Sequence, residues 1–219
     1  MARFFVDALP GAGTEYELTG ENAEHARVLR LRPGETVPAP TEPRAAVSVW
    51  IAFPKADKAE HVIQKATELG AAEIVLFPTR FCVSRPDAKS LGKKLERWQK
   101  IARSAAEQSR RGRIPEVRAV DSYEAALQEA ATADLPVLFY ENEHARTLRA
   151  ALDDSRAIGS EGAVRICLMT GAEGGFSEEE ISRAEAAGMR ICTLGPRILR
   201  CETAPLAGLA AVMYALGEL

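Results

Sequence analysis

Two loops near the carboxyl-terminal end of the chain combine residue types that could bind a ligand and carry out chemistry. The first, residues 171–175 (GAEGG), joins glycines to one carboxylate. Glycines allow the backbone to approach a ligand closely, and the amino terminus of a following helix favours electron-rich groups. The loop is neither a GxGxxG motif nor a P-loop, so a tight strand-to-helix turn stays open as the alternative.

The second loop, residues 194–204 (LGPRILRCETA), sets two arginines, a glutamate and a threonine among apolar residues. We predict that Ile198 and Leu199 contact an apolar ring, while Arg200 and Glu202 face a polar reactant. In the structural alternative, Arg200 and Glu202 pair with each other and the threonine caps the next helix.

Strand and helix patterns alternate from residue 47 onward and predict an α/β fold with a parallel sheet. Ligands bind such sheets at the carboxyl ends of the strands, which directs attention to loops 140–142, 170–176 and 195–201. Strands are expected at 47–53, 73–77, 136–140, 164–169 and 189–194, with a short extended segment at 115–117. Helices are expected at 58–69, from 90 onward, at 122–131, at 143–152, after 177 and from 204 to the end.

Several residues mark the expected helix ends. Asp57 and Ser122 are predicted N-caps, and Gly70 ends the helix 58–69. Ser90 is expected to open the long helix. Ser177 with a glutamate three residues later forms a capping box.

The last helix has almost no polar face. It carries Leu206, Leu209, Val212, Met213 and Leu216 with five alanines around them, so it is buried either within the domain or at a subunit interface. We predict an interface, and the alternative is a helix that only covers the sheet.

The distribution of charge suggests a polyanionic partner. The 219 residues are 47% hydrophobic and 27% charged, with a net charge of −3, as in ordinary soluble globular proteins. Residues 80–118 carry twelve Lys or Arg and four Asp or Glu, a local net charge of +8. Such a basic block indicates nucleic acid, and the alternative is a solvated helix face.

Other function classes find no support in the sequence. The amino terminus lacks the apolar run of a signal peptide, and the longest uncharged stretch has 14 residues, whereas a membrane span needs about 20. We therefore expect a cytoplasmic protein. Four Cys and three His are scattered without metal-ligand spacing, so we predict no metal site and surface or packing roles for the histidines.

A proline-rich linker at residues 38–44 predicts two domains. Residues 1–44 form a small β-rich domain with the linker, and residues 45–219 form the α/β domain.

Five segments in order carry a family resemblance: residues 54–58 (PKADK), 64–70 (QKATELG), 107–109 (EQS), 171–176 (GAEGGF) and 194–204. The chain resembles the ribosomal RNA small subunit methyltransferase E family, which uses S-adenosylmethionine to methylate N3 of a uridine in 16S rRNA of the small ribosomal subunit. The resemblance implies a SPOUT-like parallel sheet with a C-terminal trefoil knot, preceded by a PUA-like β-barrel domain. It also implies a homodimer with active sites at its interface.

The sequence departs from the family pattern at several positions. Ala56 and Arg110 stand where glycine is usual, Ala172 where proline is usual, and Cys201 where threonine is usual. The region before residue 54 is also short for a full barrel. We expect either a shortened barrel or a segment absent from this chain.

Loop position and the chemistry of methyl transfer suggest roles for particular residues. Arg200 would stabilise the uracil anion, and Glu202 or Glu173 would accept the N3 proton, directly or through water. The alternative for Glu202 is a carboxylate in the first turn of the last helix, where it complements the helix dipole. The expected cofactor contacts are Tyr140, Met169, Thr170, Gly171, Gly174, Leu194, Gly195, Ile198, Leu199 and Thr203. The expected RNA contacts are Arg27, Arg30, Arg32, Arg110, Arg111 and Arg113.

Three other hypotheses remain open. The chain could be a Rossmann-like enzyme that uses a nucleotide or NAD, although GxGxxG is missing. It could be a non-catalytic RNA-binding relative, or a SPOUT enzyme that acts on another RNA such as tRNA.

Overall fold

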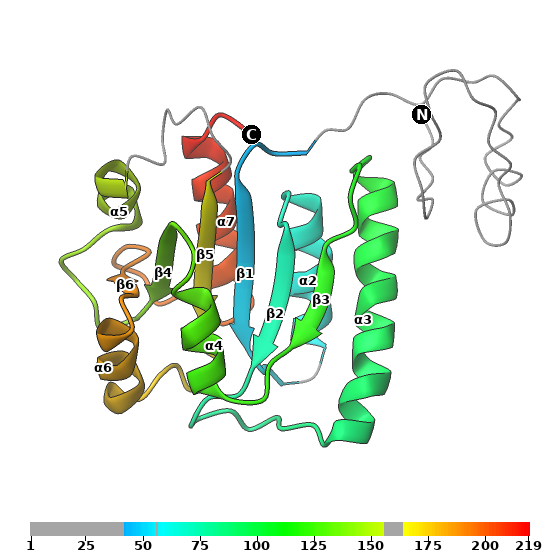
Figure 1. The fold of residues 1–219 in the computed structure, drawn as a ribbon, viewed down its shortest axis with the longest axis horizontal. Helices are drawn as coiled ribbons and strands as arrows, with labels where there is room; N and C mark the ends of the chain where they lie inside the picture. Colours follow the sequence, from blue (N-terminus) through cyan, green and yellow to red (C-terminus); the bar gives the residue numbers. More distant parts are fainter. Residues whose placement is uncertain (1–41, 56, 156–163) are drawn as a thin grey trace, which may run out of the picture.

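A six-stranded parallel sheet lies at the centre of the described part of the chain (Figure 1). The computed structural model describes residues 42–55, 57–155 and 164–219. The strand order is β3-β2-β1-β5-β4-β6, and every pairing is parallel. The strands are β1 (Ala46–Ala52), β2 (Glu73–Phe77), β3 (Glu116–Ala119), β4 (Leu135–Phe139), β5 (Arg165–Thr170) and β6 (Arg190–Cys192). The predicted α/β class is thus confirmed.

The central strands are apolar along almost their whole length because helices cover both faces of the sheet. All five residues of β4 are buried, as are the last four of β2 and the last five of β5. A parallel strand buried on both faces reads as a continuous apolar run rather than as an alternating one. This explains why the strand segments were readable from sequence, with ends that differ by a few residues.

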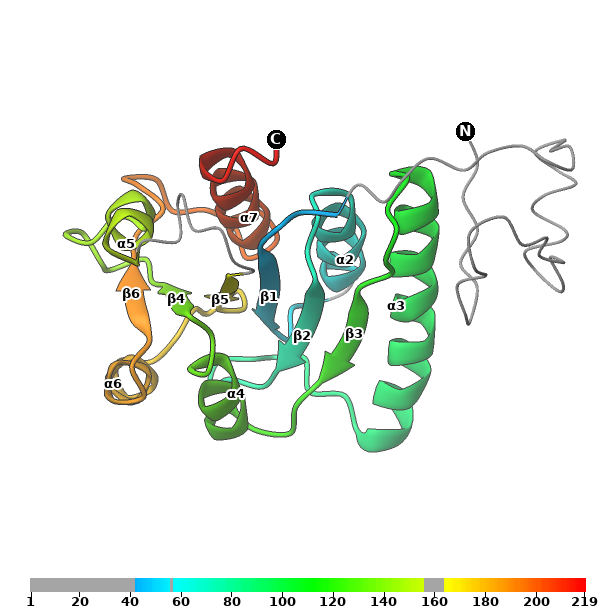
Figure 2. The ribbon, with the colours of Figure 1, turned by 45° about the horizontal axis from the view of Figure 1, so that its top comes forward.

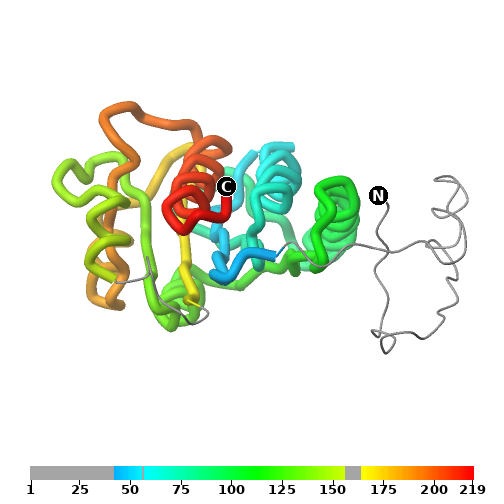
Figure 3. The backbone as a smooth tube through the Cα atoms, turned by 90° about the horizontal axis from the view of Figure 1, so that it is seen from above, coloured from blue at the N-terminus to red at the C-terminus, as the bar shows by residue number. Residues whose placement is uncertain are grey.

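Six helices flank the sheet within the described residues. They are α2 (Lys58–Glu68), α3 (Ala88–Gln108), α4 (Tyr123–Ala130), α5 (Leu148–Ser155), α6 (Glu178–Ala186) and α7 (Ala204–Ala215). Helices α7, α2 and α3 lie side by side on one face, and α4 lies on the other (Figures 2 and 3). Helices α5 and α6 lie beside the β6 edge.

Two predicted helix starts are confirmed by their caps. The Ser122 side chain accepts a hydrogen bond from the amide of Ala125. At α6, Ser177 accepts from the amide of Glu180, whose carboxylate accepts from the amide of Ser177, so both halves of the capping box are present.

Helix α2 begins at Lys58 with Asp57 in the N-cap position, as predicted, although the Asp57 side chain makes no capping bond. Two other predicted starts need correction. Helix α3 begins before Ser90, because Asp87 accepts the Ser90 amide at 2.8 Å and takes the capping position. The helix expected from residue 143 begins at Leu148. The Glu143 carboxylate accepts the amides of Ala145 and Arg146, and the Thr147 hydroxyl accepts the amide of Ala150 at the helix start.

Helices α2 and α3 end in the same kind of turn. After α2, Gly70 has φ +95°, and the amide of Ala71 bonds to the carbonyl of Ala66. After α3, Arg110 has φ +62°, and the amide of Arg111 bonds to the carbonyl of Ala106. This Schellman geometry requires a left-handed residue, normally glycine. Gly70 fits that requirement, and Arg110 holds the same backbone conformation without being glycine.

Helix α7 packs on β1, β5 and α2 with one side and leaves a stripe of its surface uncovered. A Cβ atom at Gly208 would lie 2.6 Å from the ring of Phe139, so the helix lies close to the end of β4. No helix of the described residues is long and apolar enough to cross a membrane. The predicted domain 1–44 falls almost wholly outside the described residues, as do its predicted RNA contacts Arg27, Arg30 and Arg32 and the departure at residue 56.

Candidate functional site

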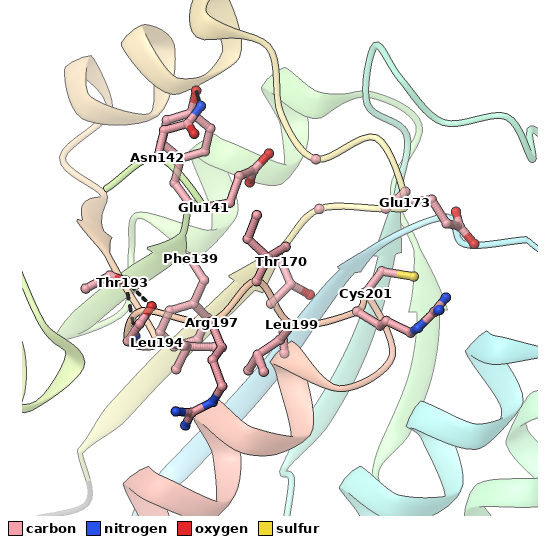
Figure 4. A pocket seen from close by; sticks show the side chains of 18 of the residues that line it. Phe139, Glu141, Asn142, Thr170, Glu173, Thr193, Leu194, Arg197, Leu199 and Cys201 are labelled. Carbon is pink, nitrogen blue, oxygen red and sulfur yellow. Dashed lines mark hydrogen bonds between the residues drawn. The ribbon is translucent and has the colours of Figure 1, made fainter. Parts of the chain in front are cut away.

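The carboxyl ends of three neighbouring strands, β5, β4 and β6, open into one cavity of about 600 Å³ (Figure 4). The loops that follow these strands supply most of its wall, and they are the three loops singled out from the sequence. Adjacent parallel strands bring loops together that lie far apart along the chain. The predicted convergence of residues 140–142, 170–176 and 195–201 is therefore confirmed.

The glycine loop after β5 is a tight turn that also lines the cavity. The amide of Gly175 bonds to the carbonyl of Ala172 at 3.0 Å, and Gly175 has φ +62°. A Cβ atom at Gly171 would lie 2.9 Å from the backbone of Gly175, so a side chain there would collide with the turn. The two interpretations offered by the sequence are compatible, because the turn exposes backbone to the cavity.

A stack of aromatic rings holds the glycine loop in place. Phe176 is buried and stacks on Phe77 of β2, with ring centroids 6.4 Å apart. Tyr123 of α4 packs against both rings, and its hydroxyl donates to the carbonyl of Glu180. The loop therefore begins on a central strand and ends in the core, which makes it a rigid wall.

The loop between β6 and α7 forms the opposite wall. Thr193 accepts the amide of Gly195 at 3.1 Å and donates to its carbonyl, which closes a small turn at the end of β6 (Figure 4). Leu194 and Leu199 are half-buried and line the cavity, and Ile198 lines it while remaining 84% exposed. The apolar surface predicted for this loop is present.

Charged groups from three elements meet beside the cavity. The ammonium of Lys58, the first residue of α2, lies 3.0 Å from Glu173 Oε1 and 3.2 Å from Glu202 Oε2. The Cys201 thiol donates to Glu202 at 3.2 Å and lies 3.6 Å from the Lys58 nitrogen. The suggestion that Glu202 pairs with Arg200 is therefore wrong, because Lys58 occupies that carboxylate.

These contacts shift the acid–base behaviour of the cluster. Hydrogen bonding to Glu173 raises the pKa of Lys58, against the opposing effect of burial. Burial disfavours the charged form of Glu173, but the hydrogen bond and charge of Lys58, together with the backbone amides of Glu173 and Lys55, hold the pKa of Glu173 below its usual range. The pKa of Glu202 is likewise lowered against burial, by its own backbone amide, Cys201 and Lys58. Burial, then the bond to Glu202, raises the pKa of Cys201 to about 12.

Most of the residues predicted for the site line the cavity, and four do not. Met169 is fully buried within β5, and Gly174 faces Phe81, since a Cβ there would lie 2.6 Å from the Phe81 side chain. Thr203 is exposed and makes no capping bond to α7, so its alternative role as a side-chain cap is wrong. Glu202 does not line the cavity itself, but it contacts Lys58, which does. The lining members are Tyr140, Thr170, Gly171, Glu173, Leu194, Gly195, Ile198, Leu199 and Arg200.

Several lining residues were not predicted. Lys58 is the most important of them, and its only signal was its place in the segment PKADK. Glu141 belongs to the loop 140–142, which was expected at the ligand site. Its carboxylate lies against Gly175, where a Cβ would come within 2.4 Å of it. His144 also lines the cavity, although a surface role was expected for it.

The basic residues around the end of α3 divide into two groups. Arg110 and Arg113 are exposed, as an RNA contact requires. Arg111 is only 4% exposed, and its guanidinium bonds to the carbonyls of Thr67 and Ala71 and to Glu42. Its predicted contact with phosphate is therefore wrong, because these groups use the guanidinium inside the protein.

The uncovered side of α7 carries small and aromatic residues at helical spacing. We call this the α7 stripe, and it consists of Ala207, Ala210, Ala211 and Tyr214. Tyr214 is 77% exposed, and it is among the large apolar side chains of the described residues that face solvent. The helix thus covers the sheet and also presents a surface of its own.

Comparisons with known proteins agree on one family. The sequence model of the RNA methyltransferase domain matches residues 41–213. The chain is 41% identical to the Ribosomal RNA small subunit methyltransferase E of Bacillus subtilis over 77% of this chain and 66% of that protein. It is 32% identical to the protein of the same name from Mycobacterium bovis over 95% of this chain and 90% of that protein. A Ribosomal RNA small subunit methyltransferase E from Neisseria gonorrhoeae, solved bound to S-adenosyl methionine, superposes with a TM-score of 0.77 at 29% identity and covers 97% of both chains.

Proposed function

Because the chain belongs to the ribosomal RNA small subunit methyltransferase E family, we propose that it methylates N3 of a uridine in 16S rRNA, using S-adenosylmethionine. The observation that carries this proposal is the cavity at the ends of β5, β4 and β6, which the three loops after these strands line. The substrate is the small ribosomal subunit or its rRNA, and the protein acts in the cytoplasm.

The cavity suits S-adenosylmethionine in size and in lining. Its volume of about 600 Å³ lies within the range of small-molecule and cofactor pockets. Leu194 and Leu199 offer an apolar wall for a ring, and Gly171 and Gly195 line the cavity without a side chain that would keep a ligand away from the backbone. When bound, the cofactor supplies an electrophilic methyl group on a sulfonium.

The chain must also favour the deprotonated base, because N3 of uridine is only weakly acidic. Arg200 is exposed at the cavity, where its guanidinium would stabilise negative charge developing on the uracil carbonyls. Glu173 or Glu202 would accept the N3 proton, directly or through water. Hydrogen bonds hold the pKa of both carboxylates below its usual range, so both are in the ionised form that can accept a proton at neutral pH.

Two finer features of the fold belong to the same proposal. The chain leaves β6 at the edge of the sheet and returns across the cavity to α7, which packs on β1 and β5. This return path supports a trefoil knot of the SPOUT type. A PUA-like domain in residues 1–44 rests on the family resemblance.

We further propose that the active protein is a homodimer that pairs through the α7 stripe. Small residues at positions i, i+3 and i+4 allow two helices to approach closely, and Tyr214 offers an aromatic anchor of the kind enriched at interfaces. The exposed Ile198 belongs to the cavity wall and to the loop that leads into α7, which supports an active site beside the interface.

RNA would be held by basic side chains outside the cavity. Arg110 and Arg113 are exposed at one end of α3, and Lys89, Lys93 and Lys100 are exposed along that helix. Contacts of this kind set affinity and salt dependence but do not select the base. The cavity loops would therefore choose the uridine.

The test uses small ribosomal subunits from a strain that lacks this protein. Purified protein and labelled S-adenosylmethionine are added, and the rRNA nucleosides are identified by mass spectrometry. We expect new 3-methyluridine, with Arg200→Ala reducing its formation at least a hundredfold. If labelled nucleoside appears only in another RNA, that RNA and not 16S rRNA is the substrate. Cofactor binding without any transfer would favour a non-catalytic RNA-binding protein.

A further inference from the structure

Lys58 joins three elements that are otherwise separate at the cavity. It begins α2, whereas Glu173 belongs to the loop after β5 and Glu202 to the loop before α7. We propose that Lys58 is a positioning residue for methyl transfer, which holds Glu173 and Glu202 together beside the cavity and keeps both carboxylates ionised. The inference rests on the proposed function, because it assigns these carboxylates to the reaction.

The start of α2 is a rigid place from which to present an ammonium. Ala59, Val62 and Ile63 are buried under the helix, so its first turn is fixed against the sheet and against α3. The amide of Lys55 donates to Glu173 at 3.1 Å and adds a second bond from the same segment. Glu173 of the glycine loop is therefore held by the backbone amide of Lys55, just before α2, and by the ammonium of Lys58, the first residue of α2.

The geometry places two negative charges close together. Both carboxylates touch one ammonium, at 3.0 and 3.2 Å, so the two contacting oxygens are at most about 6 Å apart. At such a separation, like charges disfavour each other's ionised form, whereas a cation between them favours both. Side chains that are about a quarter exposed, as these three are, experience this coupling more strongly than fully solvated ones.

Other ionisable groups surround the cluster. The Cys201 thiol contacts both Lys58 and Glu202 from the loop before α7. Arg197 and Arg200 of that loop line the same cavity, as do Glu141 and His144 from the segment after β4. None of these side chains forms an ion pair with Glu173 or Glu202 among the interactions found in the described residues. Lys58 is thus the cation that compensates the carboxylate pair.

Removal of the ammonium should separate the two loops and raise the pKa of one carboxyl group. In Lys58→Met, one of the two carboxylates would take up a proton at a higher pH than in the wild type. The acidic limb of the pH–rate profile would move upward by about one pH unit. At neutral pH, where both groups stay ionised, kcat would fall at least tenfold because the carboxylates lose their position. Because Lys58 holds catalytic groups rather than RNA, KM for the ribosomal subunit would change less than threefold.

The experiment compares Lys58→Met and Lys58→Arg with Lys65→Met. Lys65 lies on the same helix and pairs with Glu68 away from the cavity, so its variant controls for the loss of a lysine ion pair from α2. Carboxyl carbons of ¹³C-labelled glutamate are titrated by NMR in each variant, with Glu173→Gln and Glu202→Gln to assign the two signals. Methyl transfer to subunits is measured from pH 4.5 to 9, and thermal unfolding verifies that each variant is folded.

We expect Lys58→Met to raise the titration midpoint of one assigned carboxyl and to shift the pH–rate profile, Lys58→Arg to restore most of both, and Lys65→Met to behave as the wild type. Unchanged titrations in a folded Lys58→Met protein would overturn the inference, as would a loss of rate without any shift of the profile. If the wild type transfers no methyl group, the proposed function fails. The carboxyl titrations would then still decide whether Lys58 holds the pair ionised.

Discussion

Arg111 and Glu42 form an ion pair that joins the segment before β1 to the turn after α3. Arg111 Nη2 lies 2.6 Å from Glu42 Oε2. The same carboxylate accepts the amides of Gly112 and Arg113, while the guanidinium satisfies carbonyls at the end of α2. One buried arginine thereby fixes three segments, which gives it a structural role in the middle of a basic cluster.

Replacement of Arg111 is expected to destabilise the fold. Arg111→Met leaves Glu42 and two carbonyls without their partner, and breaking a buried pair from one side costs about 3–5 kcal/mol. Urea unfolding followed by circular dichroism measures the loss. The matched control is Arg113→Met, because this neighbour is exposed and should change stability by less than about 0.5 kcal/mol. Equal effects of the two substitutions would contradict the structural assignment.

The same pair predicts a pH dependence of stability. Although burial disfavours the charge on Glu42, Arg111 and two backbone amides hold the pKa of this carboxyl below its usual range. A carboxyl with a lowered folded-state pKa stabilises the protein above its unfolded-state pKa, and this contribution disappears as pH falls through the folded-state value. Free energies of unfolding measured from pH 7 to 3 should therefore fall less steeply in Glu42→Gln than in the wild type. Parallel curves for the two proteins would argue against the pair.

Arg110→Gly is expected to raise the stability of the fold and to weaken RNA binding. The left-handed conformation after α3 costs a non-glycine residue about 1–2 kcal/mol, so glycine should raise the free energy of unfolding by about 1 kcal/mol. Loss of one phosphate contact should weaken RNA binding and lower the salt slope by about one. Arg110→Ala serves as the control, since it removes the charge but keeps the strain. RNA binding that is unchanged in both variants would exclude Arg110 from the interface.

Cys201 is expected to be a slow nucleophile despite its place at the cavity. Its pKa of about 12, against an ordinary value of 9.0, lowers the thiolate fraction at pH 8 about a thousandfold. A more basic thiolate is also the stronger nucleophile, which offsets part of the loss in labelling rate. Labelling of Cys201 should then be roughly 30-fold slower than that of a free thiol. Kinetics with a disulfide reagent measure the rate, and Cys201→Ser shows which signal belongs to this residue. Labelling as fast as that of free cysteine would contradict the buried contact with Glu202.

A charge placed on the α7 stripe should break the proposed dimer. Tyr214→Glu is expected to give a monomer by light scattering and to lower methyl transfer, because like charges would meet across the two-fold axis. Val83→Glu is the control, since Val83 is also an exposed apolar side chain but lies before α3. A Tyr214→Glu protein of the same mass as the wild type would exclude this stripe as the interface.

Local patterns in the sequence were sufficient for the strands, most helices and the convergence of three loops. A strand buried on both faces is apolar along its length, and the capping box at Ser177 needs residues only three positions apart. These features depend only on residues close together in the sequence. The convergence of the cavity loops then follows because parallel strands all end at the same edge of the sheet.

The failures involve contacts between distant residues or a competing local bond. Lys58 is more than a hundred residues from both Glu173 and Glu202, so no spacing rule connects them. Arg111 is one of three arginines within four residues, and only the turn after α3 decides that its side chain enters the protein while its neighbours stay outside. The helix predicted from residue 143 starts later than its composition suggested, because the Glu143 carboxylate accepts the amides of Ala145 and Arg146.

Ile198 lines the cavity and is 84% exposed, in the loop that leads into α7. In the proposed homodimer, a second copy on α7 that also covers this loop would link cofactor binding thermodynamically to self-association. The factor by which pairing tightens cofactor binding must equal the factor by which the cofactor tightens pairing. The apparent cofactor affinity would then rise with protein concentration, and dilution alone would act as an inhibitor.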